Sequence, residues 1–140
     1  RGRSNLELQS QSISCVVSTD FISVRPDAKT KDAIEELIKA QMSEGYCIDA
    51  NNKFIGKFAL TELLSAPYQA SLAQHLMADP VKLDHAASVL QAMEVASNFV
   101  GETIPIINEE TGLMIGVVSE ANIFDAYLTT QSQVHDLEHN

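Results

Sequence analysis

Hydrophobic and polar residues follow the same succession of patterns twice along this chain. Apolar residues recur at helical spacing in two segments, at Ala33, Ile34, Leu37 and Ile38 and at Val89, Leu90 and Met93. A short apolar stretch precedes each predicted helix, FISV or PVKL, and a strand follows it, YCI or TIPII. Next come a turn rich in breakers, DANNK or NEETG, a second strand, FIGKF or LMIGVV, and a closing helix, TELLSA or EANIFDAYL. The predicted order is β-α-β-β-α, twice.

The two halves align with one another as an internal repeat. A shift of 59 residues lays residues 12–40 over residues 71–99 without a gap, and apolar positions coincide. One extra residue in the second turn then brings FIGKFALTELL over MIGVVSEANIF, with Gly56 on Gly116. A turn between two strands tolerates such an insertion well, so the gap is consistent with a repeat.

The predicted fold class is α+β, with two repeats packed through their sheets around a pseudo-twofold axis. A half of about 55 residues is too small to bury its own sheet face, which is why we expect the halves to pack together. Such packing creates two equivalent clefts between the halves. We divide the chain into an N-terminal linker (1–11), repeat 1 (12–70), repeat 2 (71–130) and a polar C-terminal tail (131–140).

Composition narrows the functional classes. The formal charge of −10, from 9 basic and 19 acidic residues, argues against nucleic acid or an anionic membrane surface as partner. No window approaches 18 consecutive apolar residues, so no membrane insertion of this segment is expected. Cys15 and Cys47 lie far apart in apolar surroundings, which predicts two buried, reduced thiols. No nucleophile and base form a pair, and we expect no enzyme activity.

Taken together, PVKL after HLMAD, TIPIIN in the middle and GVVSEAN at the end resemble a pair of CBS domains, also called a Bateman module. The resemblance covers residues 12–129. Its most specific element is the last one, because the family pattern there is Gly, two hydrophobic residues, Ser or Thr, two free positions, and Asp or Asn.

The resemblance implies an adenine nucleotide site in one cleft, with ATP, ADP or AMP as a regulatory ligand and no required cofactor. Ser119, at the first turn of a helix, suits a phosphate, and Asn122 one turn later offers an oxygen to the ribose. The adenine is expected against backbone edges. The implied nucleotide-binding residues are Asp79, Pro80, Val81, Thr103, Ile104, Pro105, Ser119 and Asn122.

Repeat 1 departs from this pattern at each matching position. Ala59 stands where the hydroxyl is needed, Glu62 where the ribose ligand is needed, and Tyr46 in place of the proline. Because a carboxylate repels a nearby phosphate, we expect at most one competent site, built mainly from repeat 2.

Simpler explanations stand beside these roles. Ser119 is also a good helix N-cap, worth about 1 kcal/mol without any ligand, and Asn122 is also an ordinary exposed helix residue. His135 and His139 in HDLEH have a spacing that can bind a metal, but no third ligand accompanies them, and we expect no metal site.

Three functional hypotheses remain open. The first is a cytoplasmic regulatory module, tethered to the inner membrane in its parent protein, that senses adenine nucleotides and modulates an attached ion channel or transporter. The start RGRSNLEL resembles the connector to a C-terminal CBS pair in bacterial ClC chloride channels and transporters. A Mg²⁺ or cation transporter is the alternative parent. The second hypothesis is a ligand-free dimerisation module, since CBS pairs often form homodimers, and the third is the regulatory part of a metabolic enzyme.

Overall fold

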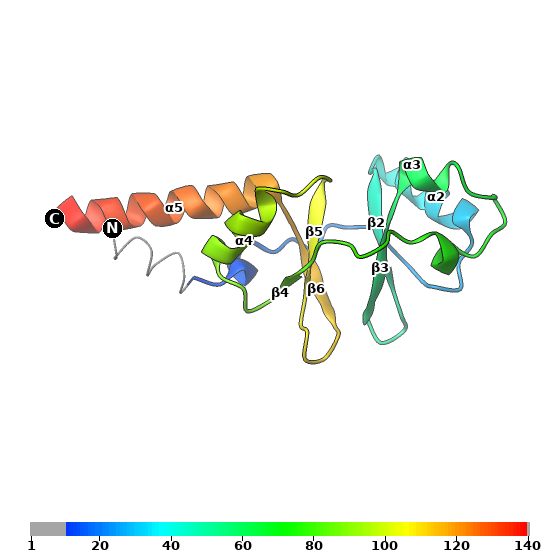
Figure 1. Cartoon of the computed structure of the whole chain (residues 1–140), viewed down its shortest axis with the longest axis horizontal. Coiled ribbons are helices and arrows are strands. Elements are labelled where there is room, and N and C mark those ends of the chain that lie inside the picture. Colours follow the sequence, from blue (N-terminus) through cyan, green and yellow to red (C-terminus); the bar gives the residue numbers. More distant parts are fainter. Residues whose placement is uncertain (1–10, 140) are drawn as a thin grey trace.

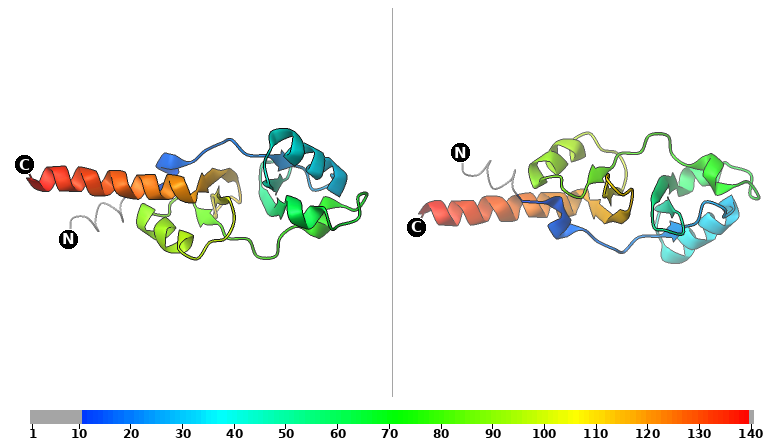
Figure 2. Two further views of the ribbon diagram at one scale, coloured as in Figure 1. Left: turned by 90° about the horizontal axis from the view of Figure 1, so that it is seen from above. Right: turned by 90° about the horizontal axis from the view of Figure 1, so that it is seen from below.

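The computed structural model describes the backbone of residues 11–139 and the side chains of residues 11–131. Two three-stranded sheets stand face to face in the middle of the molecule, and each carries its helices on the outer side (Figure 1). Figure 2 shows the same arrangement from above and below, with the helix α5 extending away from the rest of the molecule. The predicted α+β architecture is confirmed.

Both halves follow the predicted order, with a short 3₁₀ helix added at the start of each. The first half contains η1 (Ile13–Val16), β1 (Ser23–Val24), α2 (Thr30–Ala40), β2 (Glu44–Ile48), β3 (Phe54–Ala59) and α3 (Leu60–Leu63). The second contains η2 (Leu72–His75), β4 (Leu83–Asp84), α4 (Val89–Ala96), β5 (Thr103–Ile107), β6 (Met114–Ser119) and α5 (Glu120–His139). In each sheet a parallel pair is followed by an antiparallel hairpin, in the order β1-β2-β3 or β4-β5-β6.

Local signals in the sequence explain where the helices begin and which face they bury. Ser88 and Gln91 form a reciprocal capping box at the start of α4. Helix α2 buries Ala33, Ile34 and Leu37, as the apolar spacing predicts. Ile38 belongs to the same apolar pattern but is 60% exposed.

Each hydrophobic core is completed by a residue from the other repeat. Ile13, from the beginning of repeat 1, is buried among residues of repeat 2 such as Ala92 and Ile123. Leu72, from the beginning of repeat 2, is buried among residues of repeat 1 such as Ala33 and Leu63. The two repeats therefore exchange their first segments, and neither repeat fills its core alone.

Backbone hydrogen bonds accompany this exchange and repeat with the internal symmetry. The N–H of Thr30 donates to Ala70 O at 2.8 Å, and at the equivalent place the N–H of Val89 donates to Gln11 O at 2.9 Å. The N–H of Ser18 donates to Val117 O, and the N–H of Met77 donates to Lys57 O, each at 2.8 Å. Matching bonds on the two sides confirm the pseudo-twofold relation between the repeats.

The hairpin tips show where the pseudo-twofold axis passes. Lys53 and Leu113, which are equivalent positions in the two repeats, form an antiparallel bridge with one another. On either side of it the N–H of Phe54 donates to Gly112 O, and the N–H of Met114 donates to Asn52 O. A contact between two equivalent residues lies on the axis that relates them.

The two cysteines have different surroundings, which corrects the expectation that both are buried. Cys47 is buried in β2, and burial, with a smaller contribution from the charge of Asp27, raises the pKa of its thiol to about 11. Cys15 is exposed, because η1 turns only Ile13 toward the core.

The C-terminal helix α5 runs from Glu120 to His139 and so passes through the segment that the sequence assigned to a polar tail. The side chains of residues 132–139, which include His135 and His139, lie outside the described residues, as do residues 1–10 of the predicted linker. Among the helices described, none combines the length and the apolar character needed to span a bilayer.

The two equivalent glycines provide a test of the exchanged segments. In Gly116→Ala the added Cβ would collide with the backbone carbonyl of Ser18, and we expect a loss of about 1–3 kcal/mol in the free energy of unfolding, measured in urea. The matched variant Gly56→Ala brings Cβ to 2.8 Å from Cδ1 of Leu76, the end of a flexible side chain, so its loss should be smaller. An equal or larger loss in Gly56→Ala would contradict this reading.

Candidate functional site

The predicted nucleotide-binding residues come from neighbouring parts of the second sheet. Thr103 begins β5 and pairs with Ser119 at the end of β6, so these two lie side by side. Residues 79–81 directly precede β4, whose Leu83 pairs with Ile106 of β5. The strand order β4-β5-β6 therefore places residues 79–81 and Ser119 on opposite sides of β5.

Ser119 and Asn122 hydrogen-bond to one another at the start of α5. Ser119 Oγ accepts from the N–H of Asn122 at 3.1 Å and donates to Asn122 Oδ1 at 2.9 Å. Asn122 Oδ1 also accepts from the N–H of Ser119 at 3.3 Å. This is a reciprocal cap on the helix, and it uses the oxygen that the sequence assigned to the ribose. The amide N–H₂ group of Asn122 is the polar group that this cap does not use.

The other predicted residues differ in how much surface they offer. Ile104 and Pro105 are buried within β5. Asp79 is exposed and has a left-handed backbone, with φ of 46°, which a non-glycine residue adopts only in special turns. Val81 is 40% exposed. The accessible part of the candidate site is therefore Asp79, Pro80 and Val81 on one side and Ser119 and Asn122 on the other.

A segment of repeat 1, which sequence reasoning missed, also borders this site. Ser18 and Val117 exchange two backbone hydrogen bonds of 2.8 and 2.9 Å, which lays residues 17–18 along β6 just before Ser119. Gly116 permits this approach, because any side chain there would occupy the space of the Ser18 carbonyl. Residues 17–18 of repeat 1 therefore border the candidate residues of repeat 2.

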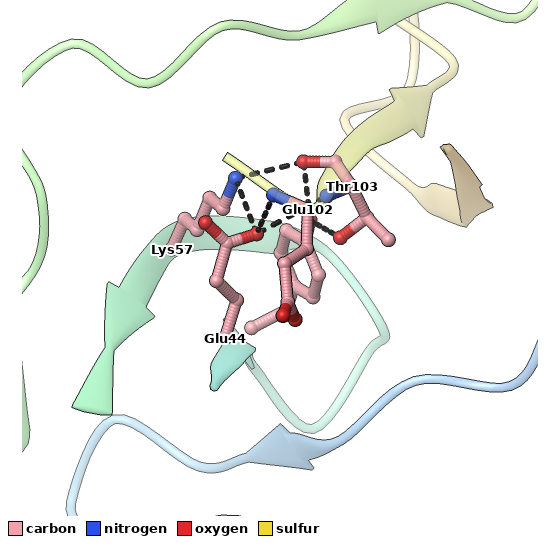
Figure 3. A network of polar contacts seen from close by, with 5 residues as sticks. Glu44, Lys57, Glu102 and Thr103 are labelled. Atoms are coloured by element: carbon pink, nitrogen blue, oxygen red, sulfur yellow. Dashed lines mark hydrogen bonds and ion pairs between the residues drawn. The ribbon is translucent and has the colours of Figure 1, made fainter. Parts of the chain in front are cut away.

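Thr103 is held by three side chains of repeat 1 (Figure 3). Its carbonyl oxygen accepts from Lys57 Nζ at 2.7 Å and from the Tyr46 hydroxyl at 3.2 Å. Its hydroxyl contacts the Tyr46 hydroxyl at 2.5 Å, and its N–H donates to Glu44 Oε1 at 3.1 Å. A base edge can use these backbone groups of Thr103 only by displacing repeat 1.

Lys57 and Glu44 form a buried ion pair between the sheets. Lys57 Nζ lies 3.0 Å from Glu44 Oε1, and the two side chains are 1% and 10% exposed. Lys57 Nζ also lies 5.0 Å from the centre of the Phe99 ring. Burial, together with the nearby negative charges, raises the pKa of the Tyr46 hydroxyl far above its usual value, so this group stays a neutral donor.

The residue type of Lys57 suggests exposure, and only comparison of the two repeats indicates that it is buried. Lys57 lies in FIGKF, and a lysine in a strand ordinarily faces solvent. Its equivalent in repeat 2 is Val117, a buried apolar residue, and this mismatch between the repeats is the feature that marks Lys57 as buried.

At the equivalent of Ser119 and Asn122, repeat 1 has a different surface. Ala59 gives no side-chain cap to α3, which has only four residues. Beside α3 lies an open cavity of about 560 Å³ lined by Glu62, Ser65, Gln74 and His75, among others. Across the part of the chain with described side chains, no group of three His, Cys, Asp or Glu residues stands close enough to hold a metal ion.

Comparison with known proteins gives the class of fold. Residues 13–68 match the model of the CBS domain family. A search of curated protein sequences finds no match. The match on repeat 1 is informative, because the resemblance noted in the sequence rested mainly on repeat 2.

Three solved structures extend the comparison to both repeats. CBSX2 from Arabidopsis thaliana in complex with AMP has a TM-score of 0.73 at 17% identity, over 86% of this chain and 98% of that one. The cytosolic domain of the Mg²⁺ channel MgtE in complex with ATP has a TM-score of 0.74 at 15% identity, over 85% of this chain and 50% of that one. CbpB in complex with c-di-AMP has a TM-score of 0.79 at 11% identity, over 96% of both chains. Residues 13–68 are thus similar to a CBS domain, and the chain has the fold of a CBS-domain pair.

The capping role of Ser119 is testable without a ligand. Ser119→Ala should lower the free energy of unfolding by about 1 kcal/mol, since it removes the cap of α5. Ser119→Thr keeps the hydroxyl and should lose clearly less. Urea unfolding of the two variants measures the difference, and equal losses would show that the hydroxyl does not cap the helix.

Proposed function

We propose that this chain is a regulatory module that binds an adenine nucleotide at a single site on repeat 2. The observation that carries the proposal is the pair Ser119 and Asn122 at the start of α5, within a CBS-pair fold. The N-terminus of a 20-residue helix favours a phosphate, and the Asn122 N–H₂ group adds donors to it. Structures of the same fold contain AMP, ATP or c-di-AMP, which supports this class of ligand.

The position of the site agrees with a regulatory role. It lies where residues 17–18 of repeat 1 meet β6 of repeat 2, so a ligand there contacts both repeats and favours one relative position of the two. Repeat 1 lacks the matching hydroxyl, and its Glu62 would repel a phosphate. One nucleotide per chain is the expected stoichiometry.

Thermal unfolding with and without nucleotide tests the proposal. ATP, ADP, AMP and c-di-AMP are added separately at millimolar concentration, and a ligand at 100 times its Kd should stabilise the protein by about 2.7 kcal/mol. No shift with any of the four would overturn the sensor function.

Matched variants locate the site. Ser119→Ala and Asn122→Ala should abolish most of the ligand-induced shift, whereas Glu62→Ala, at the equivalent of Asn122, should leave it unchanged. The ligand-induced shift is compared within each variant, because loss of the cap lowers the midpoint by itself. A shift that survives in Asn122→Ala but disappears in Glu62→Ala would assign the site to repeat 1.

An exposed apolar face supports the second candidate function, a homodimerisation module. Phe124 and Leu128 of α5 are 52% and 48% exposed. Phe124 borders a cavity of about 380 Å³ that Met93 and Ala96 of α4 also line. Neighbouring exposed apolar side chains beside an apolar hollow favour contact with another protein molecule.

Sedimentation velocity tests this face. The wild-type chain should sediment as a dimer at micromolar concentration, and Phe124→Glu should sediment as a monomer, since burying a carboxylate in an apolar contact is costly. Ile38→Glu on the exposed side of α2 is the control and should remain dimeric. A monomeric wild type, or two dimeric variants, would contradict the proposal.

The parent protein in our proposal is a membrane channel or transporter, with the module on its cytoplasmic side. The MgtE structure supports a transporter. The ClC-type parent rests on residues 1–8, outside the described residues, and stays a prediction beside a Mg²⁺ transporter or a metabolic enzyme. Sequencing the gene upstream of Arg1 distinguishes them, because apolar spans of about 20 residues there indicate a membrane protein.

A further inference from the structure

The Glu44 carboxylate lies in a set of donors that resembles an anion-binding site. Its Oε1 accepts from the backbone N–H groups of Glu102 at 3.0 Å and Thr103 at 3.1 Å, and it lies 3.0 Å from Lys57 Nζ (Figure 3). Two successive backbone N–H groups together with an ammonium are the donors by which proteins bind free carboxylate and phosphate groups. Here the carboxylate comes from the chain itself.

The loop before β5 surrounds this carboxylate closely. Gly101 has a φ of 147°, and a Cβ at this position would lie 2.8 Å from Glu44 Oε2. Phe99, two residues earlier, places its ring against Lys57 Nζ. Residues 99–103 of repeat 2 therefore enclose a group that belongs to repeat 1.

The fold itself does not need this ion pair. The equivalents of Glu44 and Lys57 in repeat 2 are Thr103 and Val117, and the same sheet geometry is built with them. Burying two charges carries a large desolvation cost, and well-packed apolar residues often serve stability as well or better. The pair must therefore provide something other than the shape of the sheet.

We propose that Glu44 is an internal ligand, whose carboxylate occupies an anion site made by Lys57 and the N–H groups of Glu102 and Thr103. It ties the loop of residues 99–103 to the first sheet. It also places a carboxylate in repeat 1 at the position equivalent to Thr103 of repeat 2. Since the proposal concerns only these contacts, it stands whether or not Ser119 and Asn122 bind a nucleotide.

Chemical rescue tests the anion site. Glu44→Ala removes the carboxylate and leaves the donors and a small space beside them, which acetate can reach through the 10% of the Glu44 side chain that is exposed. Thermal unfolding is compared in sodium acetate and in sodium chloride of equal ionic strength at pH 7. Acetate should raise the midpoint of Glu44→Ala by about 3–6 °C relative to chloride and leave the wild type unchanged.

Two control variants make the result specific. In Glu44→Ala with Lys57→Met the ammonium is gone, and acetate should give no shift relative to chloride. Glu44→Gln fills the space with a neutral side chain of the same size, so acetate should again give no shift. An equal acetate effect in either control would mean that acetate acts elsewhere, and it would overturn the proposal.

The test also holds if the unpaired buried ammonium prevents Glu44→Ala from folding in chloride. Recovery of the folded circular dichroism spectrum in acetate then supports the proposal. Two outcomes would show that the donors do not form an anion site and that the proposal is wrong. In the first, Glu44→Ala stays unfolded in both salts while the double variant folds. In the second, Glu44→Ala folds in both salts with the same midpoint.

Discussion

The exchange of first segments between the repeats is the constraint on which the rest of the structure depends. Ile13 fills the core of repeat 2 and Leu72 fills the core of repeat 1, so neither core is complete until both repeats are present. Backbone bonds then fix the exchanged chain against Val117 on one side and Lys57 on the other. Because each contact occurs twice, the sheets are held face to face, and the candidate residues at the end of the second sheet lie next to a segment of repeat 1.

The two repeats share one fold but differ in their polar residues at two places, the end of each sheet and the contact between the sheets. Where repeat 2 has Ser119 and Asn122 at the end of its sheet, repeat 1 has Ala59 and Glu62 and cannot offer the same cap. In the centre, the contact of Glu44 with Thr103 joins equivalent positions and lies across the pseudo-twofold axis, yet only one of the two is charged. Such divergence after duplication leaves the polar helix start of repeat 2 for a ligand, whereas the charged residue of repeat 1 serves the contact between the repeats.

The sequence predicted the order of helices and strands well, because hydrophobic periodicity is a local pattern and the internal repeat is visible when the chain is aligned with itself. It did not predict the exchange, since Ile13 shows the same apolar character whichever core it enters. It missed the burial of Lys57 because β3 is covered on both faces, and alternation along one strand cannot show that. The exposure of Cys15 and the use of Asn122 Oδ1 within the cap depend on three-dimensional geometry that no spacing encodes.

Thr103 connects the candidate site to the contact between the repeats. It pairs with Ser119 in the second sheet, while repeat 1 binds both its N–H and its carbonyl group. A ligand that interacts equally with both relative positions of the repeats shifts neither, however tightly it binds. A ligand that moves β5 or displaces the bond between Lys57 and Thr103 replaces contacts of repeat 1 with its own. The difference in its binding free energy between the two relative positions is what shifts the repeats. In the function proposed above, regulation therefore depends less on the affinity of the site than on whether the bound ligand changes the contacts of Thr103 with repeat 1.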